Sequence, residues 1–141
     1  MSHETFVYVT YITATPHKVW EALLKGELTR QYWKHEQVSD WTLGAKWALV
    51  ADDANRTVKH VGRVLECVLE KRLAVTWSAA DSADPSRLVI DLEPVGDMVR
   101  LTVTHTELTP DMRQRIGGGW PRVLSSLKSL LETSRPQNVF A

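Results

Sequence analysis

The stretch GWPRVLSSLKSLLET, residues 119–133, places its apolar side chains at the spacing of one helix face. Steps of three and four residues connect Trp120, Val123, Leu124, Leu127, Leu130 and Leu131. A helix with so broad an apolar face has to cover a hydrophobic surface formed by the rest of the chain. The fold therefore depends on what precedes this helix.

The residues at the start of the helix interrupt the pattern. Gly117, Gly118 and Gly119 stand in a row, and Pro121 follows. Glycine costs about 1 kcal/mol relative to alanine inside a helix, and proline is tolerated without a kink only in the first turn. The sequence predicts a break or kink here, with a short turn at 112–116 and the main helix at about 119–133. Residues 134–141 are expected to form a loose tail.

A series of β signals precedes the helix. In the last of them Val99, Leu101, Val103 and His105 alternate with polar residues, so we expect this set to face the core. Similar rows are formed by Leu73, Val75 and Trp77 and by Trp47 and Leu49. Short polar or Gly/Pro links separate the signals, which makes neighbouring strands antiparallel. The expected strands lie at 37–41, 45–51, 57–69, 73–79, 87–93 and 98–106.

The chain opens with a further strand, at 4–13, and two short helices. Thr15 is a helix N-cap and Pro16 suits the first helical position, so the first helix is expected to run to about Lys25. The spacing of Leu28 and Tyr32 predicts a second helix through about Trp33. The fold class is therefore α+β, in which a curved antiparallel sheet of about six to seven strands packs against the long C-terminal helix.

Composition limits the function classes. The chain has 141 residues with 43% hydrophobic and 24% charged residues, as expected for one globular domain spanning 1–141. Lys plus Arg (17) balance Asp plus Glu (17), which argues against nucleic acid or an anionic membrane as a partner. Cys67 has no intrachain cysteine partner, and the first residues do not resemble a signal peptide, so a cytoplasmic location is expected.

The motifs of common catalytic and cofactor sites are missing from the sequence. There is no Gly-x-Ser-x-Gly elbow, and the glycine triplet lacks the Gly-Lys-Ser/Thr ending of a phosphate-binding loop. The five histidines are scattered, and only Cys67 offers sulfur to a metal. No catalytic residue, metal site or cofactor is therefore assigned.

The unusual feature of the composition is six Trp against two Phe. Tryptophan suits both packed cores and the walls of ligand pockets, because it joins a large apolar ring to one N–H donor. The sequence favours a cavity between the last helix and the sheet. Its predicted lining is Trp47, Trp77, Leu101, Val103, His105, Trp120 and Leu124. A fully packed core without a ligand would give the same pattern, and His105 would then be a structural histidine.

The run Thr15-Pro16-His17-Lys18-Val19-Trp20-Glu21-Ala22-Leu23 resembles the opening helix of the SRPBCC (START-like, helix-grip) superfamily. The similarity is to the branch named after the activator of heat-shock protein 90 ATPase. Further segments match in order: Tyr32-Trp33, Ser39-Asp40-Trp41 with Gly44 and Trp47, Gly62 to Glu66, Arg72-Leu73 with Thr76-Trp77, Leu101 to His105, and Gly119-Trp120 with Leu124 and Leu127. The resemblance covers nearly the whole chain and implies the helix-grip fold.

The resemblance implies less about function, because this fold hosts lipid carriers, hormone receptors, polyketide cyclases and chaperone activators. The first hypothesis is non-enzymatic binding of a small hydrophobic or aromatic molecule. Bacterial single-domain relatives are often encoded beside ArsR-type repressors, which implies a role in stress or small-molecule responses.

Two alternatives stay open. One is a protein-interaction module, either a homodimer or a chaperone partner, that uses exposed aromatic residues such as Trp33 or Trp41. Eukaryotic activators carry a further domain for chaperone binding that 141 residues cannot hold, which argues against the chaperone partner. The other is an enzyme resembling polyketide cyclases, with His105 as acid/base and a nearby carboxylate to orient it.

Overall fold

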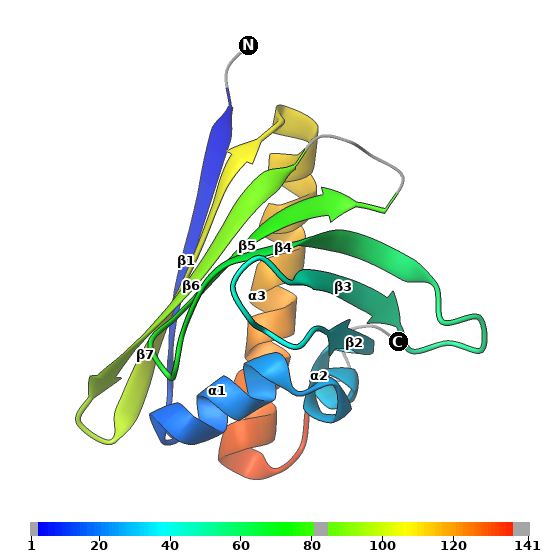
Figure 1. Ribbon diagram of the computed structural model, residues 1–141. Helices are drawn as coiled ribbons and strands as arrows, with labels where there is room; N and C mark the ends of the chain where they lie inside the picture. Colours follow the sequence, from blue (N-terminus) through cyan, green and yellow to red (C-terminus); the bar gives the residue numbers. More distant parts are fainter. Residues whose placement is uncertain (1–2, 81–84, 137–141) are drawn as a thin grey trace.

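The computed structural model describes residues 3–80 and 85–136. Seven strands and three helices follow one another along the chain (Figure 1). In order they are β1 (Glu4–Ile12), α1 (Pro16–Leu24), α2 (Gly26–Trp33), β2 (His35–Val38), β3 (Lys46–Ala51), β4 (Val58–Val68), β5 (Arg72–Ala79), β6 (Ser86–Val95), β7 (Met98–Leu108) and α3 (Pro110–Thr133).

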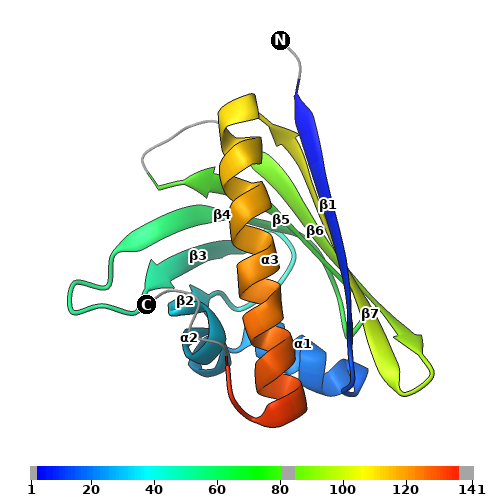
Figure 2. The same ribbon diagram turned by 180° about the vertical axis from the view of Figure 1, so that it is seen from behind.

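All seven strands form one sheet in the order β1-β7-β6-β5-β4-β3-β2, and every neighbouring pair is antiparallel. The helices α1 and α2 carry the chain from one edge of this sheet to the other. The sheet is strongly curved, and α3 runs along its concave side, as Figure 2 shows from behind. This arrangement confirms the predicted α+β helix-grip fold.

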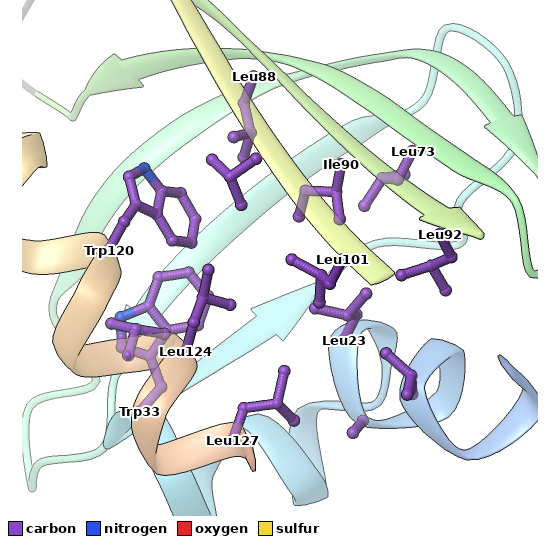
Figure 3. Packing of buried hydrophobic residues seen from close by; sticks show 14 of the residues in the cluster. Leu23, Trp33, Leu73, Leu88, Ile90, Leu92, Leu101, Trp120, Leu124 and Leu127 are labelled. Carbon is purple, nitrogen blue, oxygen red and sulfur yellow. The ribbon is translucent and has the colours of Figure 1, made fainter. Parts of the chain in front are cut away.

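The strand periodicity identified the inward faces correctly. On β7 the side chains of Val99, Leu101, Val103 and His105 are all buried. They meet α3, from which Trp120, Leu124 and Leu127 point toward Leu88, Ile90 and Leu101 of the sheet (Figure 3). The helix and the sheet therefore enclose one shared hydrophobic core.

The strand predicted at 37–41 is wrong in its position, because β2 spans His35–Val38. Residues after Val38 form a turn that their own side chains hold. The Ser39 hydroxyl donates to the Lys46 carbonyl (2.8 Å) and accepts from the Trp41 N–H (3.0 Å), while the Asp40 carboxylate accepts from the Thr42 N–H (3.0 Å). Such local bonds compete with a strand ladder.

The predicted separation of the last helix into two pieces is also wrong, because α3 is continuous from Pro110 to Thr133. The segment on either side of the glycines packs on the sheet: Met112 and Ile116 lie against the core on one side, and Trp120 is buried in it on the other. This packing outweighs a propensity cost of about 1 kcal/mol per glycine. Residues 134–136 lie beyond the helix and are exposed, and residues 137–141 of the expected tail lie outside the described residues.

Candidate functional site

A cavity of about 560 Å³ lies between the first half of α3 and the strands β3, β4 and β5. Its helical wall comes from one face of α3, with Met112, Ile116, Gly119, Trp120 and Val123. Its sheet wall comes from Leu49, Lys59, His60, Trp77 and Ala79, and the end of α2 adds Trp33 and, next to it, His35. The cavity thus lies where α3, the sheet and α2 meet.

Three tryptophans from three different elements form the aromatic part of the wall. The ring centroids of Trp33 and Trp120 are 5.5 Å apart, those of Trp77 and Trp120 5.7 Å, and those of Trp33 and Trp77 6.3 Å. These separations are within the usual range for interacting aromatic rings. The three rings are at least nine-tenths buried, so they form a largely pre-formed apolar surface.

Trp77 has a second aromatic layer behind it. Trp47 lies 5.2 Å from Trp77 between ring centroids and donates its indole N–H to the Thr76 carbonyl (2.8 Å). Gly62 makes this possible, because a Cβ there would lie 1.9 Å from the Thr76 carbonyl oxygen and 2.5 Å from the Trp47 indole nitrogen. Trp47 therefore supports the wall from outside the cavity.

Two buried polar atoms at the cavity have no hydrogen-bond partner among the described residues. They are Nε1 of Trp77 and Nδ1 of His60, whose rings lie 4.5 Å apart. Burial lowers the pKa of His60, so its ring is largely neutral near pH 7. Most buried polar atoms in proteins have partners, which makes this pair of neighbouring atoms unusual.

His105 stands at the centre of a chain of hydrogen bonds in the core. The Trp120 indole N–H donates to His105 Nδ1 (3.2 Å), and His105 Nε2 lies 2.7 Å from the Ser86 hydroxyl, which donates to the Trp77 carbonyl (2.8 Å). Since an indole nitrogen can only donate, Nδ1 carries no proton and Nε2 does. The neutral ring is therefore the form that fits.

The environment of His105 keeps it neutral. Burial, together with a smaller effect of the nearby His60, lowers its pKa to about 4. Its bonded partners among the described residues are Ser86 and Trp120, neither of which is a carboxylate. His105 is thus placed to fix the orientation of Trp120 and not to exchange protons near neutral pH.

The seven predicted lining residues separate into two groups. Trp77 and Trp120 line the cavity. The other five are buried in the core beside it and do not reach its surface: Trp47, Leu101, Val103, His105 and Leu124. Trp33, expected as an exposed aromatic, is buried in the cavity wall, and Trp41 is half-buried.

The residues that sequence reasoning missed lie mostly on α3 and β4. Met112, Ile116 and Val123 lie on the same helical face as the predicted Trp120, but the predicted break at the glycines hid this continuity. His60 and Lys59 gave no comparable signal, because their position at the cavity depends on how β4 curves against β5.

A second hollow, of about 850 Å³, is larger but more open, and it includes outward-facing residues such as Val9 and Tyr11. Four of its five charged side chains pair with one another: Arg72 with Asp91 (2.7 Å), and Arg100 with Glu93. The cavity under α3 is therefore the better candidate for a binding site.

The family model described as "Activator of Hsp90 ATPase homolog 1-like protein" matches residues 13–132. This chain belongs to that family. The match runs from the end of β1 to the end of α3 and so includes every residue of the cavity wall.

Solved structures show the same fold as this family member. The crystal structure of CalU16 from Micromonospora echinospora has a TM-score of 0.76 at 21% identity, over 92% of this chain and 77% of that one. A solution structure of an Aha1 dimer from Colwellia psychrerythraea has a TM-score of 0.77 at 19% identity, over 92% and 97%. Protein MLL2253 from Mesorhizobium loti has a TM-score of 0.77 at 25% identity, over 92% and 97%. Among curated proteins none matches significantly.

Two further features concern the described part of the chain. Within residues 3–80 and 85–136, no three His, Cys, Asp or Glu side chains come together as metal ligands would. In the same residues no helix has the length and apolar character needed to span a membrane.

Proposed function

We propose that this protein binds a small hydrophobic or aromatic molecule in the cavity under α3. The observation that carries the proposal is the cavity itself, about 560 Å³ with Trp33, Trp77 and Trp120 in its wall. Ligand pockets measure roughly 300–1,000 Å³ and are mostly apolar with a few polar groups. The volume and the lining both agree with this class of site.

Gly119 supports a ligand role for the space. It lines the cavity, and a Cβ added to it would meet no atom within 4 Å. A side chain at this position would therefore extend into empty space and would also favour the helix. The glycine leaves room that the helix alone does not require.

The experiment is a titration with N-phenyl-1-naphthylamine, a neutral dye whose fluorescence rises in apolar surroundings. We expect saturable binding accompanied by energy transfer from the tryptophans of the wall. Gly119→Leu should weaken binding at least about tenfold, because the new side chain occupies the cavity. The matched control is Gly118→Leu, since Gly118 is exposed, does not line the cavity and also has free space around its Cβ.

Equal dye binding by the two leucine variants would place the dye elsewhere and refute the proposal. Loss of binding in both variants would show that the effect comes from the helix and not from the cavity, and would refute it as well. Far-ultraviolet circular dichroism of both variants verifies that α3 is intact.

A second candidate function is self-association through β1. This strand is an edge of the sheet, and its outer face exposes Val7, Val9 and Tyr11, an apolar row that a second copy of the chain would cover. The relative from Colwellia psychrerythraea is a dimer. Sedimentation equilibrium should show a dimer that Val9→Lys dissociates and that Leu43→Lys, at an exposed turn position, leaves intact. A monomeric native protein would refute it.

A further inference from the structure

We infer that the ligand of this cavity carries an anionic group, such as a carboxylate, held at the β4 side of the cavity mouth while its apolar body lies against the tryptophans. The inference rests on the proposed function and specifies the chemical class of the ligand. It follows from the charges at the mouth and from the unpartnered Trp77 N–H in the wall.

Among the described residues, the charged groups of the lining have one sign only. Lys59 and Arg115 line the cavity, and no Asp or Glu of the described residues does so. The chain as a whole has equal numbers of acidic and basic residues, so this local imbalance does not follow from composition. A mouth with basic groups only attracts an anion and disfavours a cation.

Within the described residues, neither of the two fully charged side chains is held in a buried ion pair. Lys59 is exposed and forms no ion pair with any described residue. Arg115 pairs with Asp111 at 3.5 Å, but both side chains are 81% exposed. An exposed pair within one helix stabilises little, so Arg115 can turn from Asp111 to a ligand oxygen at small cost.

The deeper part of the wall supplies a donor without an acceptor. Trp77 is 3% exposed, and its unpartnered Nε1 can only donate a hydrogen bond. His60 Nδ1, in the neighbouring ring, is unpartnered as well, while a hydrogen bond to the Ser78 backbone favours a proton on the other ring nitrogen. A buried polar atom without a partner costs about 1–3 kcal/mol, and an anionic oxygen would satisfy the Trp77 N–H with a charge-assisted bond.

The test compares two dyes that share one skeleton. N-phenyl-1-naphthylamine is neutral, and 1-anilinonaphthalene-8-sulfonate is the same molecule with a sulfonate. The variant Lys59→Met/Arg115→Met removes both mouth charges. The matched control, Lys18→Met/Arg122→Met, removes the same charge from exposed residues of α1 and α3 that do not line the cavity.

We expect the Lys59/Arg115 variant to bind the sulfonate at least about tenfold more weakly and the neutral dye within about twofold of the native protein. The control should leave both dissociation constants within about twofold. Because all four residues are exposed or at the mouth, each variant should also keep the native unfolding temperature.

The outcomes separate the two claims. If the neutral dye binds in the cavity but the Lys59/Arg115 variant weakens both dyes equally, or neither, the anionic group is refuted and the binding function stands. The same holds if the control weakens the sulfonate as much as the Lys59/Arg115 variant does. If neither dye binds, or Gly119→Leu displaces neither, the cavity is not a binding site and both claims are refuted.

Discussion

At the scale of single residues, His105 shows that strand alternation predicts burial but does not predict hydrogen-bond partners. The alternation of β7 predicted that this side chain faces inward, and it is fully buried. Its partners could not be predicted, because Ser86 and Trp120 reach it from β6 and α3, 19 and 15 residues away along the chain. A pattern within one strand does not encode a hydrogen-bond network built from three elements.

The pKa of His105 predicts how stability depends on pH. Above about pH 6.5, histidine is neutral in both the folded and the unfolded chain, so its contribution is constant. As the pH falls below that value the unfolded chain binds a proton, whereas folded His105, with its pKa near 4, does not. The free energy of unfolding should therefore fall, by about 2 kcal/mol between pH 7.5 and pH 5, and level off below the folded pKa.

Urea unfolding at several pH values measures this loss, with His105→Gln as the control. Glutamine can accept from Trp120 and donate to Ser86 but does not titrate. The variant should be less stable at neutral pH and should show a shallower decline toward pH 5. Since the pKa of His60 is lowered too, His60 contributes in both proteins and cancels in the comparison. Parallel curves for the two proteins would contradict the assignment.

At the scale of elements, the sequence predicted the two short helices and six of the seven strands, misplaced the strand expected at 37–41, and mispredicted the interior of α3. Local propensity correctly registers that glycine and proline weaken a helix. Local propensity does not include the contacts that the sheet makes with the helix. Four residues of α3 pack against the core and line one cavity: Met112, Ile116, Trp120 and Val123. Apart from Trp120, the cavity's helical wall was missed for the same reason, because it extends across the glycines.

The glycines of α3 should differ in what an alanine does to stability. A Cβ at Gly118 meets no atom within 4 Å, so Gly118→Ala should raise the free energy of unfolding by about 0.5–1 kcal/mol. A Cβ at Gly117 would lie 2.8 Å from Arg113 Nη1, and the Arg113 guanidinium lies over the Phe6 ring at 4.9 Å. Gly117→Ala should therefore stabilise less or destabilise, because Arg113 must move off that ring.

Thermal and urea unfolding of the two alanine variants provide the measurement. Equal stabilisation would mean that Arg113 moves freely and that its position over Phe6 contributes nothing. A loss of stability in Gly118→Ala would mean that this exposed position has a contact that its free space does not suggest.

At the scale of the whole molecule, the C-terminal half of α3 packs in the core, whereas its N-terminal half borders the cavity. Its fully or nearly buried residues all follow the glycines: Trp120, Val123, Leu124, Ser126 and Leu127. The helices α1 and α2 close this end of the molecule (Figures 1 and 2). Before the glycines, Met112 and Ile116 are only half-buried and line the cavity. The buried contacts of α3 are thus concentrated at one end, and the other end borders the cavity, which Trp120 and Val123 also line.

This asymmetry predicts a gradient of hydrogen exchange along one helix. Local opening costs least where few apolar contacts hold an element, so amides of residues 112–119 should exchange at least about tenfold faster than those of 123–131. A bound molecule would contact Met112, Ile116 and Gly119. These contacts exist only while this part of α3 is folded. Saturating N-phenyl-1-naphthylamine should therefore slow exchange in residues 112–119 and leave residues 124–131, which do not line the cavity, unchanged. In Gly119→Leu the dye should have no effect. Uniform protection along α3 in the free protein would show that the helix opens as one unit and that the cavity does not loosen it.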